Sequence, residues 1–415
     1  MRALQLTIAF FGVASAGCNA IFGIVGGEVT GGGGSGGAGG SGGTTSSTTS
    51  DTSMTTGAET TTATGGGGTG GAGGGCLPER PDTCEPATLD DPENCCVAGR
   101  SCQGGACESG ECGPAPIAAS QNPGGEEVLD VVVVGDKVFW SSGYGTKLYM
   151  TSIDGGPQFT HATSNDSPNK YLTRLATDGE HVYYTNWGSG RIVRVPVEGG
   201  ALEIVAEVPD TGTPPEAGFG QIAVGGGHVF WAMAKTGGAY HASLASLPAE
   251  AELLDAAGWH GVATDETFVY WSTTDDVILK RPLSDLSAAP ETVVSGQASI
   301  LDVEVIEDRI YWATYGSVSS AVKDGLNKLL VTVYDGGVTP LGIAGDGRDV
   351  FFTLGGCDSC NPPVRGYLYR APVLGGPLVE LVASTGFGDV RGVTMDCDTV
   401  YAANSADRTV LKLTR

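Results

Sequence analysis

The chain has 415 residues, long enough for two or three domains, and its 22 Lys and Arg against 47 Asp and Glu give a formal net charge of −25. This acidity argues against a protein that binds the phosphate backbone of nucleic acids and against one that binds membranes through a basic patch. The 68 glycines follow no G-X-Y period, so the chain is not a collagen.

Residues 1–17 have the features of a signal peptide. A single early arginine precedes an apolar run, Leu4 to Val13, that is too short for a membrane span of about 20 residues. The small residues before Cys18 resemble the lipobox of bacterial lipoproteins, although Ser15 stands where a Leu is usual. We expect Cys18 to become a lipidated N-terminus. The alternatives are secretion after cleavage before Gly17, or an uncleaved anchor.

Residues 18–75 are expected to form a flexible tether. Between residues 31 and 75, Gly, Thr and Ser supply 38 of 45 residues, and aromatic residues, Lys and Arg are absent. Such a segment buries too little apolar area to offset the conformational entropy lost on folding. Its root-mean-square span of roughly 35–40 Å would hold a domain clear of a membrane surface. A glycosylated Thr-rich stalk is the alternative.

Residues 76–112 are expected to form a disulfide-rich module. The segment holds seven of the 11 cysteines and few apolar residues, so bridges must supply its stability. A zinc site fits less well, because the segment has no His and no CxxC pair. We expect Cys357 and Cys360 to bridge to each other and Cys397 to bridge to the module. The predicted disulfide cysteines are Cys76, Cys84, Cys95, Cys96, Cys102, Cys107, Cys112, Cys357, Cys360 and Cys397.

From residue 113 onward, one phrase recurs seven times: an aliphatic strand, an Asp/Gly turn, and a β-branched residue followed by aromatics. Its copies are 40 to 50 residues apart and end at Trp140, Tyr184, Trp231, Trp271, Trp312, Phe352 and Ala402. Two further strands fit before each next copy, and four antiparallel strands in this length are typical of a propeller blade. We therefore predict an all-β, seven-bladed β-propeller over residues 113–415; a β-sandwich would not repeat one phrase in this way.

Two details of the repeat predict packing. An aliphatic residue stands nine positions before each anchor residue, and a usually small residue follows it. We expect these residues on the crowded innermost strand, with the anchor aromatics filling the wedge between blades rather than stacking on a ligand. The last copy has only three strands, so the segment from Pro114 to Ser120 is predicted to supply the fourth and close the ring.

The stretch from Val182 to Gly200, "VYYTNWGSGRIVRVPVEGG", resembles the YWTD repeat of low-density-lipoprotein-receptor propellers. The copies are also similar to the TolB-type and NHL-type propellers of bacterial envelope proteins. The resemblance implies the propeller fold. It does not imply receptor function, because Asn186 replaces the Asp of the motif and seven copies differ from the six blades of that family.

Candidate binding residues stand where each inner strand begins. Two acids, two arginines, a Gln and a His would converge near the axis of a regular propeller and could hold a polar ligand or a divalent cation. The alternative is a solvated rim of mutually neutralising charges. The candidates are Asp130, Arg174, Gln221, His260, Asp302 and Arg391.

Enzyme signatures are missing from the sequence: it has no nucleophile elbow, H-E-x-x-H motif, P-loop or dinucleotide fingerprint. We therefore predict no catalytic residues, no metal and no cofactor. The leading hypothesis is a non-catalytic binding propeller, lipid-anchored to the outer membrane or surface of a bacterial cell. Its partner would be a protein or polar ligand of the envelope, and not a nucleic acid.

Two other hypotheses remain. One is a propeller lyase or hydrolase that acts on a polar extracellular substrate, using His260 with Asp302 or Arg391. The other is a structural surface protein.

Overall fold

The computed structural model describes residues 90–96, 98, 100–108, 111–119, 127–143, 147–163, 172–186, 189–208, 218–233, 237–327, 330–356, 362–385 and 388–415. The predicted signal peptide and tether lie outside the described residues, as do Cys18, Cys76, Cys84, Cys357 and Cys360.

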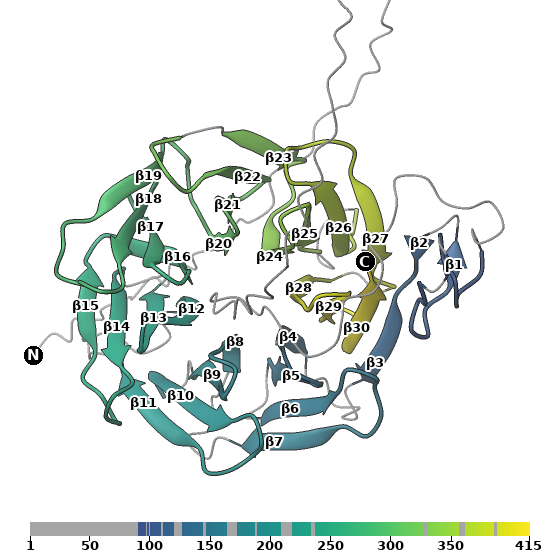
Figure 1. Cartoon of the computed structure of the whole chain (residues 1–415), viewed down its shortest axis with the longest axis horizontal. Helices are drawn as coiled ribbons and strands as arrows, with labels where there is room; N and C mark the ends of the chain where they lie inside the picture. Colours follow the sequence, from purple (N-terminus) through teal and green to yellow (C-terminus); the bar gives the residue numbers. More distant parts are fainter. Residues whose placement is uncertain are drawn as a thin grey trace, which may run out of the picture. The chain divides into compact units, whose positions relative to one another are not determined.

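Seven four-stranded antiparallel sheets are arranged as blades around a central axis (Figure 1). This confirms the predicted all-β, seven-bladed propeller. Each blade runs from its inner to its outer strand in chain order, except the last. In the part of the chain that the structure describes, no helix is long and apolar enough to span a membrane.

The first four blades have regular meander topology. Blade 1 consists of β4 (Val128–Val134), β5 (Lys137–Ser142), β6 (Lys147–Ser152) and β7 (Phe159–Thr163). Blade 2 consists of β8 (Leu172–Thr177), β9 (His181–Asn186), β10 (Arg191–Pro196) and β11 (Glu203–Glu207). Blade 3 consists of β12 (Phe219–Gly225), β13 (His228–Met233), β14 (Ala239–Ser243) and β15 (Glu252–Asp255). Blade 4 consists of β16 (Gly258–Thr264), β17 (Phe268–Thr273), β18 (Val277–Pro282) and β19 (Glu291–Ser295).

The last three blades complete the ring. Blade 5 consists of β20 (Asp302–Ile306), β21 (Arg309–Ala313), β22 (Ser317–Val322) and β23 (Val331–Asp335). Blade 6 consists of β24 (Pro340–Gly345), β25 (Asp349–Leu354), β26 (Tyr367–Pro372) and β27 (Val379–Ala383). Blade 7 consists of β28 (Val390–Met395), β29 (Thr399–Asn404), β30 (Thr409–Thr414) and, from the other end of the propeller, β3 (Ala115–Ala119).

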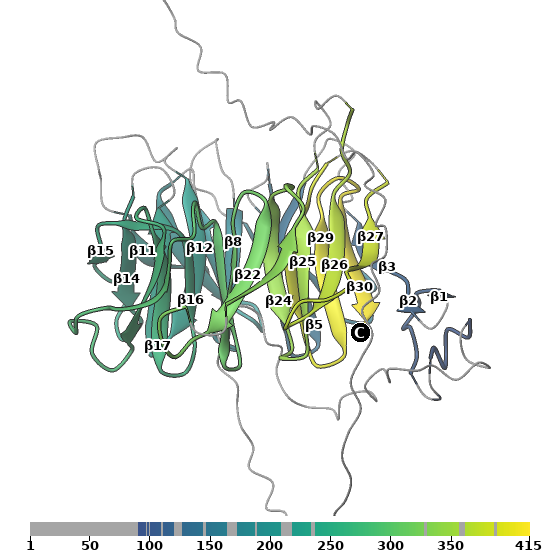
Figure 2. The same ribbon diagram turned by 90° about the horizontal axis from the view of Figure 1, so that it is seen from above.

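The pairing of β3 with β30 closes the ring as predicted. Ala115 lies opposite Lys412 and Ala119 opposite Thr409. Figure 2 shows the disc edge-on, with β3 beside β30 at the outer edge. The last blade thus gains its fourth strand from the residues that precede the first blade, and its third strand is not left as an open edge.

The nine-residue offset in the sequence becomes a direct cross-strand pair in every blade. Val131 lies opposite Trp140, Val262 opposite Trp271 and Val303 opposite Trp312, and the other four blades keep the same register. The turn that carries the Asp/Gly signal leaves two residues between the inner and second strands in blades 1, 3 and 5 and three residues in the other four blades, and the strand pairing keeps the nine-residue offset in both cases.

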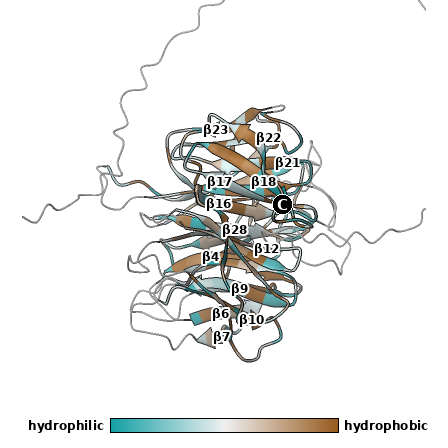
Figure 3. Cartoon of the chain, turned by 90° about the vertical axis from the view of Figure 1, so that its left-hand side faces the viewer, coloured by the Kyte–Doolittle hydropathy of each residue, from teal (hydrophilic) through white to brown (hydrophobic). Residues whose placement is uncertain are grey.

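The anchor residues form the core between blades. One apolar cluster lies between each pair of neighbouring blades, so seven clusters encircle the axis. Trp231, Trp271 and Trp312 are fully buried, which confirms the prediction that these aromatics pack in the wedge. In Figure 3 the apolar colouring is concentrated on the strands, and hydrophilic residues gather at the turns.

In several blades a side-chain hydrogen bond between Asp and Tyr stabilises the turn that joins the inner strand to the second strand. The Asp265 carboxylate accepts the backbone N–H groups of Thr267 and Phe268, and its second oxygen accepts the Tyr270 hydroxyl at 2.9 Å. Asp178 with Tyr183, and Asp396 with Tyr401, repeat this arrangement in blades 2 and 7. The Asp and the Tyr of the repeated phrase therefore hold the hairpin together.

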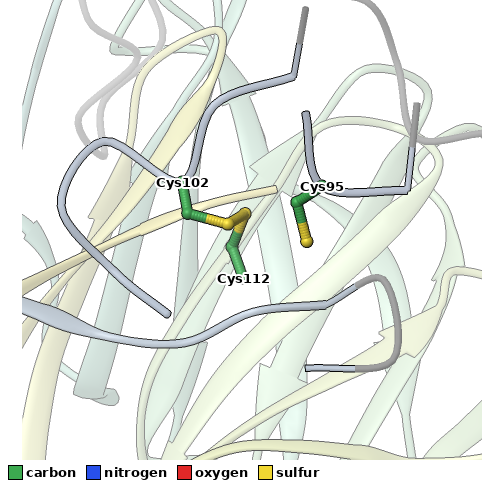
Figure 4. A group of neighbouring side chains, drawn as sticks. All are labelled: Cys95, Cys102 and Cys112. Carbon is green, nitrogen blue, oxygen red and sulfur yellow. A yellow bond between two sulfur atoms is a disulfide. The ribbon is translucent and has the colours of Figure 1, made fainter. Parts of the chain in front are cut away.

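The described part of the cysteine-rich module is a disulfide scaffold, as predicted. Bridges join Cys95 to Cys107 and Cys102 to Cys112, and the latter pair is drawn in Figure 4. Two of these cysteines, Cys107 and Cys112, lie opposite each other in a two-stranded sheet of β1 (Cys107–Glu108) and β2 (Glu111–Cys112). Cys96 and Cys397 are also disulfide-bonded. That Cys397 bridges to the module remains a prediction.

The module is docked on the end of the chain. The fully buried Arg100 donates from Nη1 to the carbonyl of Cys95, from Nη2 to that of Thr414 and from Nε to that of Arg415. The Thr414 hydroxyl donates in return to the carbonyl of Ser101 at 3.0 Å. The module therefore contacts blade 7 next to the pair of strands, β3 and β30, that closes the ring.

Candidate functional site: the axial cavity

The inner strands bring one residue from each blade to the same level of the axis. This residue directly precedes the aliphatic residue that pairs with the anchor. In chain order these axial positions are Asp130, Arg174, Gln221, Gly261, Asp302, Gly342 and Gly392. A cavity of about 60 Å³ lies between them, and four of the six predicted binding residues line it: Asp130, Arg174, Gln221 and Asp302.

His260 and Arg391 do not line this cavity. Each stands one residue before the axial position of its blade, which Gly261 and Gly392 occupy. Successive side chains of a strand point to opposite faces. The side chains of His260 and Arg391 therefore do not point toward the cavity as the four lining side chains do. Arg391 instead pairs with Asp389 at 2.6 Å. Their predicted binding role remains a prediction.

The inner strand changes register just before the paired aliphatic residue in six of the seven blades, including blades 1 to 3, whose Asp130, Arg174 and Gln221 line the cavity. This irregularity therefore does not distinguish blades 4 and 7. In those two blades glycine occupies the axial position itself, and His260 and Arg391 stand one residue before it.

Two axial side chains join blades to each other. The Asp130 carboxylate accepts the backbone N–H of Leu175 on blade 2 at 2.9 Å. The Gln221 amide oxygen accepts the N–H groups of Val262 on blade 4 and Val303 on blade 5, at 3.1 and 2.8 Å. Because each inner strand is the edge of its sheet, its backbone donors need such partners.

The glycines of the axial ring leave room for these bonds. A Cβ atom on Gly392 would overlap Oδ1 and Cα of Asp130. On Gly342 it would lie 2.9 Å from the carbonyl oxygen of Arg391. Because Gly342 and Gly392 have no side chain at the axial positions of blades 6 and 7, the neighbouring inner strands can approach closely there.

Arg174 is the cation of the cavity. Its Nη1 donates to the carbonyl of Leu341 at 3.4 Å, so the side chain reaches from blade 2 to blade 6. Its charge counteracts the effect of burial on the carboxyl pKa values of Asp130 and Asp302. It also contributes, after burial, to lowering the pKa of His260 to about 4, so this imidazole is neutral at pH 7.

Asp302 and Glu304 stand two residues apart on β20, and both line the cavity. Asp302 is 3% exposed, and its Oδ1 has no hydrogen-bond partner among the described residues. Burial raises the pKa of Asp302 to about 6, with a smaller contribution from Asp130. Burial raises the pKa of Glu304 well above its usual range, and the Asp302 charge adds to this effect.

Glu304 lines the cavity but is not among the binding residues predicted from the sequence. It occupies the position after the paired aliphatic residue, where the other six blades have Val132, Ala176, Ala223, Ala263, Ala344 and Thr394. The sequence contained a sign of this, since Glu304 is the one ionisable residue at a position where the other blades have small or apolar residues. A buried carboxyl that replaces a small residue points to a role other than packing.

Among the described residues, one group has metal-ligand spacing: Cys95, Cys102 and Cys112. All three are in disulfides, so they offer no thiolate to a metal. The axial carboxyl groups form no such group of three within 4.8 Å in the described part of the chain.

No protein-family model matches the chain, and no curated protein matches its sequence. Solved structures do match. An inactive His-to-Ala variant of virginiamycin B lyase from Staphylococcus aureus, solved with quinupristin, has a TM-score of 0.56 at 12% identity, and the match covers 73% of this chain and 99% of that one.

A second neighbour is YCF48. The protein from Cyanidioschyzon merolae has a TM-score of 0.53 at 13% identity over 73% of this chain and 99% of its own. A YCF48 structure bound to D1 peptide also scores 0.53, at 13% identity over 72% and 96% of the two chains. At these identities the likeness shows the fold alone, and one of the matched propellers is an enzyme while another binds a peptide. The chain is a seven-bladed β-propeller with an acidic axial cavity.

Proposed function

We propose that this chain is a non-catalytic binding propeller, held outside the cytoplasm by a lipidated Cys18 and displayed on the tether of residues 18–75. The resemblance of residues 1–18 to a lipoprotein signal and the oxidised cysteines of the module support an extracytoplasmic location. The resemblance of the repeated phrase to the TolB-type and NHL-type propellers of bacterial envelope proteins supports the same proposal.

The observation that carries the binding function is the Asp302 carboxyl in the axial cavity. It is buried, and one of its oxygens has no partner within the described part of the chain. Buried acceptors are nearly always paired, so an unpaired one lining a cavity indicates a donor that comes from outside the chain.

The other polar groups favour binding over catalysis. Asp130 and Gln221 already accept backbone N–H groups of neighbouring blades. A carboxylate or amide in this role holds the ring together, and proton transfer through it would disrupt the contact between blades. We therefore assign these two side chains to shaping the site.

Fractionation of a bacterial host that produces the full chain tests the anchor. We expect the protein in the membrane fraction, released by detergent, and we expect Cys18→Ser to appear in the soluble extracytoplasmic fraction. Photo-crosslinking on intact cells, followed by mass spectrometry, then identifies what the wild type contacts. A wild-type protein that is freely soluble, or one that cross-links to no protein or ligand, would contradict the proposal.

A lyase is the second candidate, and His260 is the observation that favours it. Its imidazole is neutral at pH 7 and lies within electrostatic reach of Arg174, so it could accept a proton beside a cation. Chromatography of quinupristin incubated with the full chain tests this candidate. Conversion that is lost in His260→Ala would favour the lyase, and an unchanged compound leaves binding as the function.

A further inference from the structure

The axial cavity contains more carboxyl groups than the fold requires. Asp130 has a structural role, since its oxygens accept backbone N–H groups. Among the described residues no hydrogen bond joins the side chain of Asp302 or Glu304 to another blade: the Asp302 carboxylate accepts the N–H of the adjoining Val303 while its Oδ1 is unpartnered, and Glu304 takes a position where four other blades have Ala. Glu304 is 9% exposed, so both carboxyls are buried.

The charged groups of the cavity favour a cation over an anion. In the described part of the chain, the charged side chains that line the cavity are Asp130 on β4, Arg174 on β8, and Asp302 and Glu304 on β20, and His260 on β16 lies within electrostatic reach of Arg174. With His260 neutral, Arg174 is the one cation of this set against three carboxyl groups. A carboxylate offers only acceptors, so its missing partner must be a donor.

The spacing of these carboxyls argues against a metal ion held by the protein alone. No three of them bring ligand oxygens within 4.8 Å of one another in the described part of the chain. A nitrogen cation does not need three protein ligands at that spacing, because two carboxyls can share its N–H donors in charge-assisted hydrogen bonds. A cavity of about 60 Å³ accepts such an end group but not a large ligand.

We propose that the axial cavity binds the positively charged nitrogen end group of a ligand, an ammonium or a guanidinium, through the carboxyls of Asp302 and Glu304. This inference rests on the proposed binding function and names its ligand chemistry. Protons compete with the cation for both carboxyls. Burial raises the pKa of Asp302 to about 6, so affinity increases as the pH rises through that value, and the pKa of Glu304, which burial raises well above its usual range, acts in the same direction.

The test uses the full chain, purified oxidised, and two small probes: methylammonium and methylguanidinium chlorides. The melting temperature is measured at constant ionic strength against NaCl, MgCl₂ and CaCl₂, at pH 5.0 and pH 7.5. We expect at least one of the two probes to raise the melting temperature above NaCl, more at pH 7.5 than at pH 5.0, since only the folded state has the site.

The variants Asp302→Asn and Glu304→Ala each remove one carboxyl, and Ala restores the residue that blades 2, 3, 4 and 6 carry. Each variant is compared with its own unliganded melting temperature, and we expect the affinity for the probe to fall at least tenfold. Asp335→Asn, which changes an exposed carboxylate at the end of β23, is the matched control and keeps the wild-type affinity.

Three results would overturn the proposal: no shift with either probe, equal shifts in the wild type and both variants, or a larger shift with Mg²⁺ or Ca²⁺. Each of these results would contradict the axial cation site without contradicting the proposed binding function. Cross-linking to an envelope partner that persists in both variants would keep the binding function and remove only the axial site.

Discussion

Replacing Asp302 by Asn should make the propeller more stable at neutral pH. Folding moves the pKa of this carboxyl from 3.8 to about 6, so at neutral pH the native state must hold a buried charge that the unfolded chain hydrates. A difference of about two pKa units corresponds to about 3 kcal/mol of unfolding free energy. Asn has the same shape and no charge, so we expect a gain of up to about 3 kcal/mol at pH 7.5.

The pH dependence separates this effect from a simple change of packing. A raised carboxyl pKa means that the native state binds more protons than the unfolded chain between pH 3.8 and about 6. The stability due to Asp302 is therefore complete below pH 3.8, decreases as the pH rises to about 6 and is constant above that. Hence the advantage of Asp302→Asn over the wild type should vanish near pH 4 and be complete by pH 7.

Urea denaturation of the full chain at pH 4.0, 5.0, 6.0 and 7.5 measures this difference, because the midpoints and slopes give the unfolding free energy at each pH. Asp335→Asn is the control, and its difference from the wild type should stay near zero. A variant that is less stable than the wild type at pH 7.5, or a difference that does not change with pH, would contradict this reasoning. Either result would show that the charge of Asp302 does not destabilise the folded protein.

Three further substitutions test the architecture. Tyr270→Phe removes the hydroxyl that donates to Asp265, and we expect a loss of about 1 kcal/mol in urea denaturation; no loss would mean that the turn is held without this bond. Arg100→Ala removes the donors to the carbonyls of Cys95, Thr414 and Arg415, and chemical denaturation should show a loss of about 3 kcal/mol, part of which Arg100→Lys restores. Gly392→Ala places a methyl group against Asp130, and calorimetry should show a melting temperature several degrees lower, for a loss of about 2 kcal/mol; an unchanged value would refute the close approach of blades 7 and 1.

Much of the architecture is determined by the sequence alone. The seven copies of one phrase predict the number of blades, and the constant offset between Val262 and Trp271, or Val303 and Trp312, predicts strand pairs that the structure contains. The incomplete last copy predicts the strand that β3 provides. These features are local, since a short turn with fixed chemistry determines which residues of two adjoining strands face each other, and the count of repeats determines the ring.

The composition of the site was decided by tertiary structure. Of the six residues proposed from the sequence, Asp130, Arg174, Gln221 and Asp302 line the axial cavity and His260 and Arg391 do not, and Glu304 lines it as well. In blades 4 and 7 glycine occupies the axial position, so His260 and Arg391 stand one residue away from it, and a difference of one residue turns a side chain to the other face. Which of the polar residues near the axis enclose a cavity is decided only when the seven inner strands come together.

The same holds for contacts between distant parts of the chain. The pairing of Cys95 with Cys107 and of Cys102 with Cys112, and the burial of Arg100 against Thr414, join residues whose partners the spacing of the sequence leaves open. The raised carboxyl pKa values of Asp302 and Glu304 likewise arise only when seven inner strands exclude water from one axis. Burial and long-range proximity are properties of the closed ring. They convert residues at equivalent positions of the inner strands into a candidate binding site.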